Sequence, residues 1–145
     1  MTIGRNVTVI GAYAFAGCAK LKTVKGGANV EEIGKGAFAD SKMLKTLPNM
    51  PKLSRIGDNA FKGCTSLSKI TIGKTVRYIG KYAFSGCANL KTITIKTTRL
   101  TKDSVKSGAF KGISPKATIK CPKTVVKIYK TFLPRKGLPK TAKIK

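Results

Sequence analysis

The residue types that could carry out catalysis are scarce in this chain. The sequence contains no His and no Trp, and it has five acidic residues against 30 Lys and Arg. Without His, no Ser-His-Asp or Cys-His arrangement can form. Glu31 and Glu32 are adjacent, but neighbouring side chains point in different directions, so we interpret this pair as part of a solvated loop. We therefore expect no catalytic residue and no enzyme activity.

The four cysteines leave three alternatives, namely a disulfide, a metal site or a buried structural role. Cys18, Cys64 and Cys87 are separated by multiples of 23 residues. Equivalent positions of a repeat point the same way, which suits a bridge such as Cys64–Cys87 poorly. The sequence has no CxxC pair and no His, which argues against zinc. We favour free cysteines that pack as small hydrophobic residues, with Cys121 at an inward strand position, and we expect no metal and no other cofactor.

The spacing of the cysteines is part of a longer repeat. The stretch from Ile79 to Ile95, IGKYAFSGCANLKTITI, closely matches the stretch from Ile56 to Ile72, IGDNAFKGCTSLSKITI. A fixed period of about 20 to 50 residues is typical of stacked repeat architectures, in which each unit buries its apolar face against its neighbours. The same 23-residue step separates three series of residues: Ile10, Ile33, Ile56 and Ile79; Phe15, Phe38, Phe61 and Phe84; and Leu21, Leu44, Leu67 and Leu90.

Each repeat has the pattern of two short strands joined through a turn. Residues 90–95 alternate apolar and polar side chains and are rich in β-branched residues, which predicts a half-buried strand. The preceding AFSGCANL favours a short helical turn that ends at Gly86. A second, shorter strand is expected at VRYIG, with Val76 and Ile79 facing inward.

Stacking of these units predicts a phenylalanine ladder in the interior. The last copy departs from the pattern, because Val105 replaces Ile and three additional residues fall in the loop at 96–104. Gly26 and Asn49 replace the second strand Ile in the first two repeats, so we expect shorter strands there. Ile119 and Cys121 stand where Ile93 and Ile95 stand one repeat earlier, and the ladder consists of Phe15, Phe38, Phe61, Phe84 and Phe110.

The C-terminal part has a different pattern, which predicts a helical cap. Val125, Ile128, Tyr129 and Phe132 are spaced as one apolar helix face, and Pro134 would end that helix. Stacked repeats need a cap to cover their last core layer. We therefore divide the chain into a repeat region at residues 1–121, which starts inside a repeat, and a Lys-rich cap and tail at 122–145. The segment after Pro134 is either a docked strand or a loose tail.

The repeat resembles that of the BspA-like leucine-rich-repeat family, whose 23-residue units have the form IGxxAFxGCxxLxxIxIPxSV. The resemblance covers residues 2–121, with Ser41 and Ile113 in place of the Cys. It implies an α/β fold, namely a right-handed leucine-rich-repeat solenoid of about five repeats with a parallel strand ladder, short helical turns and a C-terminal helical cap. It also implies a secreted or cell-surface bacterial protein with a role in binding or adhesion. No catalytic residue set is carried over from the family.

Neither a membrane span nor a leader is evident in the sequence. No apolar run approaches the roughly 20 residues that cross a bilayer. The N-terminal MTIGRNVTV lacks a charged region followed by an apolar one, and it aligns with KITIGKTVRYIG from residue 69 onward. We interpret the chain as a segment of a longer protein. The extracellular or cell-surface location therefore follows from the family resemblance alone.

The outward side chains of the strands form the candidate binding surface. Parallel strands lie about 4.8 Å apart, so stacked lysines would repel each other by a few tenths of a kcal/mol per pair, roughly. A Lys/Thr surface suits an anionic polymer, but lysines also serve solubility and block edge-to-edge aggregation. The predicted ligand-binding residues are Lys22, Thr23, Lys25, Lys45, Thr46, Lys69, Thr71, Lys91, Thr92, Thr94 and Lys120.

Charge bears on the partners more than on the fold. The formal net charge is +25, and residues 96–145 hold 15 basic residues against one acidic residue. This charge attracts phosphate backbones without sequence preference. Specific nucleic-acid binding is not expected, because the phenylalanines needed as stacking platforms are used in the core. We expect a monomer that binds a host protein or matrix component, with two alternatives, an anionic polymer (teichoic acid, sulfated glycan or DNA) or a purely structural spacer.

Overall fold

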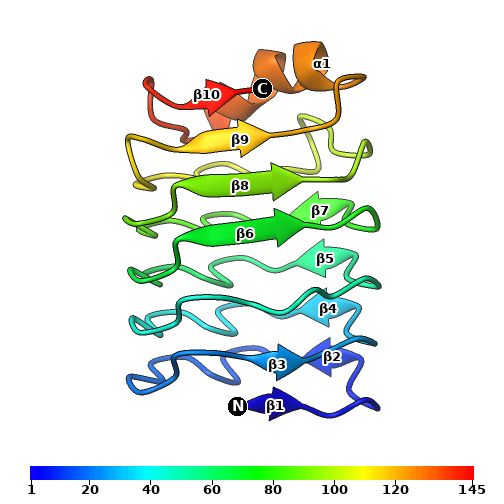
Figure 1. The fold of residues 1–145 in the computed structure, drawn as a ribbon, viewed down its shortest axis with the longest axis vertical. Helices are drawn as coiled ribbons and strands as arrows, with labels where there is room; N and C mark the ends of the chain where they lie inside the picture. Colours follow the sequence, from blue (N-terminus) through cyan, green and yellow to red (C-terminus); the bar gives the residue numbers. More distant parts are fainter.

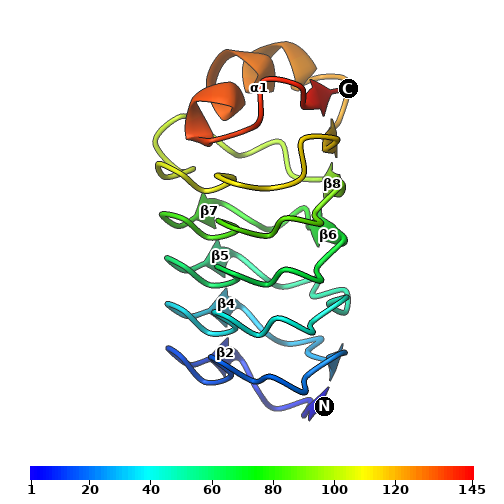
Figure 2. The same cartoon turned by 90° about the vertical axis from the view of Figure 1, so that its left-hand side faces the viewer.

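Two ladders of short parallel strands run along opposite sides of a solenoid of about six turns (Figure 1 and Figure 2). The computed structural model describes all residues from 1 to 145. The first ladder consists of β1 (Thr2–Ile3), β3 (Lys25–Gly26), β6 (Lys69–Ile72), β8 (Thr92–Ile95), β9 (Thr118–Lys120) and β10 (Lys143–Ile144). The second consists of β2 (Val9–Ile10), β4 (Glu32–Ile33), β5 (Arg55–Ile56) and β7 (Tyr78–Ile79).

The strand register confirms the 23-residue repeat. The second ladder pairs the four repeat-opening isoleucines in sequence, from Ile10 to Ile79. In the first ladder Ile93 pairs with Ile119, and in the second Ile79 bridges to Val105. Both of these steps are 26 residues, so the three additional residues lie between Ile95 and Val105, as predicted. The solenoid has about six turns rather than five because β1 and β10 add partial turns at its ends.

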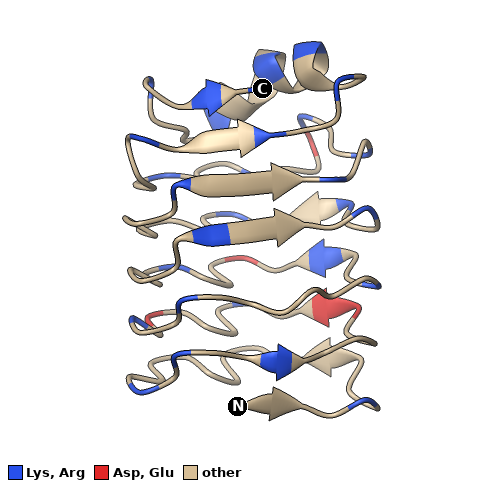
Figure 3. Ribbon diagram, viewed as in Figure 1, with Lys and Arg blue, Asp and Glu red and all other residues tan.

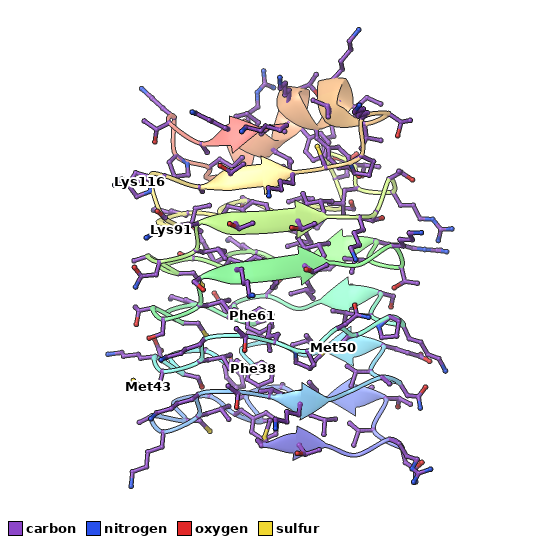
Figure 4. All side chains as sticks on the ribbon, in the orientation of Figure 1. Phe38, Met43, Met50, Phe61, Lys91 and Lys116 are labelled. Atoms are coloured by element: carbon purple, nitrogen blue, oxygen red, sulfur yellow. The ribbon has the colours of Figure 1, made fainter.

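The core is one cluster of 36 buried residues that runs the length of the solenoid. The predicted phenylalanine ladder is confirmed, with ring centroids 5.4 to 5.7 Å apart and interplanar angles of 18° or less. Figure 4 shows Phe38 and Phe61 one above the other in the interior. Because consecutive rings stack directly, each repeat depends on its neighbours for the burial of its largest side chain.

The segments between the ladders are single hydrogen-bonded turns. In AFSGCANL the Cys87 N–H donates to the Phe84 carbonyl at 3.2 Å, and the Phe84 N–H donates to Ala109 of the next repeat at 2.8 Å. Gly86 has φ of +75°, which confirms it as the end of that turn. A second left-handed position lies four residues earlier and is occupied by Tyr82, with φ of +55°. These two left-handed residues let the chain reverse within one flat repeat.

The C-terminal cap is a short helix with a different buried face from the one predicted. Helix α1 (Val126–Phe132) is followed directly by the 3-10 helix η1 (Leu133–Lys136). Ile128 was expected to face the core but is 56% exposed, and the fully buried Leu133 replaces it in the apolar stripe. Helix α1 ends at Phe132, just before Pro134, as predicted, and Pro134 lies in the first turn of η1, where a proline is tolerated.

The residues after the cap form a docked strand, which decides between the two alternatives for this segment. Strand β10 pairs in parallel with β9, and Cys121 follows β9 with its thiol donating to the Lys145 carbonyl at 3.4 Å. The boundary between residues 121 and 122 stays a prediction. No helix in the structure combines the length and the apolar composition that a bilayer crossing needs.

The interpretation of the adjacent acids as a solvated loop was wrong for one of them. Glu32 lies in β4, and its carboxylate is 3.6 Å from the Arg55 guanidinium of β5. Glu31 is exposed. The repeat itself points to this strand, because VEEIG at 30–34 is equivalent to VRYIG at 76–80, where the second strand was expected.

Candidate binding surface

The predicted ligand-binding residues all lie on the outer side of the first strand ladder or at its edge. We call their surface the strand face, defined by the eleven residues named above. Six of them lie within strands β3, β6, β8 and β9, and Thr23 and Thr46 form an isolated bridge between the first two repeats. The other three, Lys22, Lys45 and Lys91, come directly before the bridged residues Thr23 and Thr46 or before β8. The repetitive backbone therefore places all of them on one side, which leaves their role in binding as a prediction.

Each lysine that lies within a strand of the strand face is paired with a threonine. Lys69 pairs with Thr92, and Thr94 pairs with Lys120. Lys25 pairs with Thr2. The expected stacking of like charges across adjacent strands is therefore wrong for the strand positions, because each of these lysines has a threonine as its neighbour.

Lysines do lie in adjacent repeats at the edge of the ladder. The Lys45 N–H donates to the Lys22 carbonyl at 2.9 Å, so these two residues stack in register. Ser68 occupies the equivalent position in the next repeat and Lys91 the one after it. Lys45 and Lys91 both line a shallow polar groove of about 320 Å³, together with Ser66, Ser68 and Asn89. This groove contains no acidic and no apolar side chain.

The strand face is uniformly basic because its strands carry no acidic residue. Figure 3 shows Lys and Arg in blue on β3, β6 and β9, and the nearest acidic strand residue, Glu32 of β4, lies on the other ladder. The single ion pair of the structure, Glu32 with Arg55, is also on that other ladder. The lysines of the strand face are thus without an acidic partner within the chain.

The first ladder is interrupted between the second repeat and β6 (Figure 1). Residues 46–49 form no strand there, and no backbone hydrogen bond joins residues 45–49 to β6. The shorter strands predicted from Gly26 and Asn49 are confirmed by β3 and by this gap. Asn49 is exposed while Met50 is buried, so the inward position shifts by one residue in this repeat.

A cavity of about 300 Å³ opens at this interruption, and the sequence did not reveal it. Its apolar wall includes Met50, Leu53 and Phe61, and its rim includes Lys69 and Lys96. Met50 packs toward the first repeat, with its methyl carbon 3.4 Å from the position a Cβ of Gly27 would occupy. The PNMP sequence at 48–51 breaks the repeat pattern, and it is the signal that could have located the cavity.

The four cysteines are free, but only Cys64 and Cys87 have the buried role that was expected of all of them; Cys18 and Cys121 are half-buried, and Cys121 lies just outside β9. Cys64 and Cys87 are fully buried, and their thiols donate to the carbonyls of Phe38 and Phe61 at 3.0 and 3.1 Å. Ser41, at the equivalent position, donates to the Phe15 carbonyl at 2.6 Å. Burial raises the pKa of Cys64 to about 12 and raises that of Cys87 further. These thiols are therefore protonated and unreactive at neutral pH.

Solved structures with the same architecture include bacterial leucine-rich-repeat proteins, one of which is described as a cell surface protein. A leucine-rich cell surface protein from Faecalibacterium prausnitzii is 26% identical with a TM-score of 0.76, over 94% of this chain and 34% of that one. A leucine-rich repeat protein from Bacteroides ovatus is 32% identical with a TM-score of 0.69, over 84% and 31%. The pneumococcal vaccine antigen PcpA, at 17% identity, shares the fold with a TM-score of 0.73, over 100% and 41%.

These similarities concern a part of each relative. The chain spans between 31% and 41% of the length of the three proteins just named. No curated protein matches the sequence. The model of the BspA type leucine-rich repeat region, in six copies, matches residues 1–102, which include four of the five stacked phenylalanines and the interrupted ladder. The chain therefore belongs to the BspA-type leucine-rich-repeat family.

Proposed function

We propose that the chain is a non-catalytic binding or adhesion module that contacts a host protein or matrix component through the strand face. The observation that carries this proposal is the strand face itself, a long basic surface without acidic residues that is held flat by a continuous stacked core. Repetition gives such a module an extended and rigid contact surface. The structural relatives support a location at the cell surface or outside the cell, where the module acts as a monomer.

An anionic polymer is the second candidate partner. The groove that contains Lys45 and Lys91 favours it, because both ammonium groups face solvent without a carboxylate among the lining residues. A teichoic acid or a sulfated glycan carries charges that recur along its length, and a regular row of cations matches such a ligand. DNA would bind in the same way, without sequence preference.

The two candidates differ in the salt dependence of binding. The test compares the wild type with a face variant in which Lys22, Lys45, Lys69 and Lys91 are changed to Ser, on immobilised heparin and on immobilised basement-membrane extract. A polyanion site predicts that the face variant loses heparin affinity and that its slope of log K against log salt falls by roughly 3 to 4. A protein site predicts a loss on the matrix extract that persists at high salt.

A spacer role would give a third pattern. If the face variant and the wild type bind both surfaces equally, the strand face has no part in binding and the proposal is wrong. The four lysines are exposed and make no ion pair within the chain. Replacing them should change the stability by less than about 0.5 kcal/mol per site, so a loss of binding would not come from unfolding.

A further inference from the structure

We propose that the interruption of the first ladder is a binding site for an extended peptide segment, which pairs with the free edge of β6. The inference rests on the proposed function, because it names the kind of segment that a protein partner would present to the strand face. Four observations carry it: the free backbone groups of β6, the size of the cavity beside them, the apolar wall of that cavity and the lysines at its rim.

The backbone of β6 has one paired and one unpaired edge. The Thr92 N–H donates to the Ser68 carbonyl, and the Lys96 N–H donates to the Ile72 carbonyl. Even-numbered residues of this segment therefore face β8, and in a parallel ladder the intervening residues, Lys69 and Thr71, face the opposite way. Neither residue forms a backbone hydrogen bond toward the second repeat. The edge thus offers two N–H and two C=O groups in alternation.

An alternation of donors and acceptors along a strand edge is recognised by another extended backbone. Exposed strand edges bind added strands in many protein complexes, where main-chain hydrogen bonds give affinity and pockets for alternate side chains give specificity. The adjacent cavity of about 300 Å³ has the volume of about ten water molecules. This is more space than bridging waters need, and it is sufficient to receive side chains.

The lining of the cavity indicates which side chains would enter it. Met50, Leu53 and Phe61 form the apolar wall, and the exposed Lys69 and Lys96 lie at the rim. No acidic residue lines the cavity. The lining therefore fits an apolar side chain that points inward, flanked by an acidic side chain that reaches the rim lysines.

The chain itself shows why the site is open. In the third and fourth repeats Ile72 and Ile95 fill the inward position, with Thr71 and Thr94 beside them. The second repeat has Pro48 and Asn49 at these two positions. Changing them together, P48T and N49I, should give the second repeat a regular strand that occupies the edge of β6. This closed-ladder variant should lose peptide binding while its thermal stability rises.

The test follows the backbone amides of Lys69 and Thr71 by NMR and hydrogen exchange in the full chain. The probe is acetyl-Glu-Val-Ile-Val-Glu-amide at millimolar concentration, and its control is the same peptide with both central valines N-methylated, which blocks backbone pairing. We expect the probe to slow exchange at both amides by about tenfold and the methylated peptide to have no effect. Unchanged exchange at both amides with the probe would overturn the proposal.

Two variants at one position separate the backbone from the side chain. T71P removes the unpaired N–H but no hydrogen bond of the β6–β8 ladder, and proline is tolerated at such an edge position. T71V keeps the N–H and removes the hydroxyl. We expect T71P to bind the probe about five- to tenfold more weakly and T71V to bind as the wild type does. Equal binding by T71P and T71V would overturn strand pairing.

Two further outcomes would show that the peptide site is wrong, and the second would do so while leaving the proposed function intact. If a heparin disaccharide shifts the resonances of Lys69 and Lys96 and T71P binds it normally, the cavity is a sugar site and the peptide proposal is wrong. Lys22, Lys45 and Lys91 do not line the cavity. If changing these three to Ser abolishes matrix binding while the probe peptide has no effect, the proposed function stands and the inference about the cavity fails.

Discussion

One position of the repeat is occupied by different hydrogen-bond donors in successive repeats. Ser41, Cys64 and Cys87 each donate to a phenylalanine carbonyl of the preceding repeat. Ile113 occupies this position in the next repeat and has no donor. The position therefore requires a small or apolar side chain that fits the core, and the donor adds a modest stabilisation of about 1 kcal/mol.

The buried thiols make the stability depend on pH in the alkaline range. Their ordinary pKa is 9.0, and burial raises the pKa of Cys64 to about 12. Between these values the unfolded chain releases thiol protons that the folded chain retains, so the unfolded state binds fewer protons and the free energy of unfolding falls as pH rises. We expect this loss to be smaller in the double variant C64S/C87S, whose hydroxyls do not titrate in this range.

The measurement is urea unfolding of both proteins at about pH 8 and about pH 10.5, a range in which an unperturbed thiol ionises. All other residues are the same in both proteins, so the difference between the two losses isolates the cysteines. A double variant that loses as much stability as the wild type would contradict the assignment of raised pKa values to buried thiols.

At the scale of elements, the side chain of Tyr129 joins the cap helix to the loop at residues 96–104. Tyr129 of α1 is fully buried, and its hydroxyl donates to the Thr97 carbonyl at 2.7 Å and accepts from the Leu100 N–H at 3.4 Å. Both partners lie in the loop that holds the three additional residues. The insertion and the cap are therefore parts of one arrangement.

The variant Y129F should destabilise the chain by about 1 to 3 kcal/mol, because it leaves a buried carbonyl and a buried N–H without their partner. Thermal unfolding followed by circular dichroism measures this loss. The matched control is Y13F, at a tyrosine that is 54% exposed, and it should change the stability by less than about 0.5 kcal/mol. Equal effects of the two variants would show that the hydroxyl of Tyr129 does not hold the cap.

The interrupted ladder is the second element with a stability consequence. The closed-ladder variant P48T/N49I restores the pattern of the third and fourth repeats, and we expect it to raise the free energy of unfolding by about 0.5 to 2 kcal/mol. Guanidinium unfolding provides the measurement, and N49I alone serves as the comparison. A stability equal to or below that of the wild type would mean that Pro48 and Asn49 are not the cause of the gap.

At the scale of the whole molecule, the repeat made most of the fold predictable. The 23-residue step predicted both ladders and the phenylalanine core, and the longer step from Ile79 to Val105 predicted the three-residue insertion. These predictions hold because each repeat must align with its neighbours to bury its apolar face. The position of the cap helix was predictable, but its buried face was not. Two apolar faces fit the helical period equally well, one that includes Ile128 and one that consists of Val125, Tyr129, Phe132 and Leu133. Periodicity alone cannot choose between two such stripes.

The candidate site was predictable in part. Alternation along the strands placed Lys69 and Thr71 on the outer surface, and the 23-residue step implies that Lys69 pairs with Thr92. Stacked lysines occur only at the edge of the ladder, as in the Lys22 and Lys45 pair. The cavity beside β6 was not predictable from a repeat pattern, because it arises where the pattern fails. A break at Pro48 indicates an irregular strand, whereas the open volume depends on where Met50 packs.

The most direct test of the account is a comparison of two variants with the same net charge. The face variant described above removes four lysines of the strand face, and a matched control changes Lys35, Lys62, Lys81 and Lys111 to Ser, all of them exposed residues outside the strand face. Each lowers the formal net charge of +25 by four. The measurement is the ratio of their dissociation constants on basement-membrane extract and on heparin at physiological salt.

Because the two variants share their charge, diffuse attraction affects both alike and the ratio reports the position of the lysines. The account predicts that the face variant binds at least one of the two surfaces about tenfold or more weakly than the control variant does, which corresponds to about 1.4 kcal/mol or more. A ratio near one on both surfaces would contradict it, and would mean that the strand face is not where this module binds.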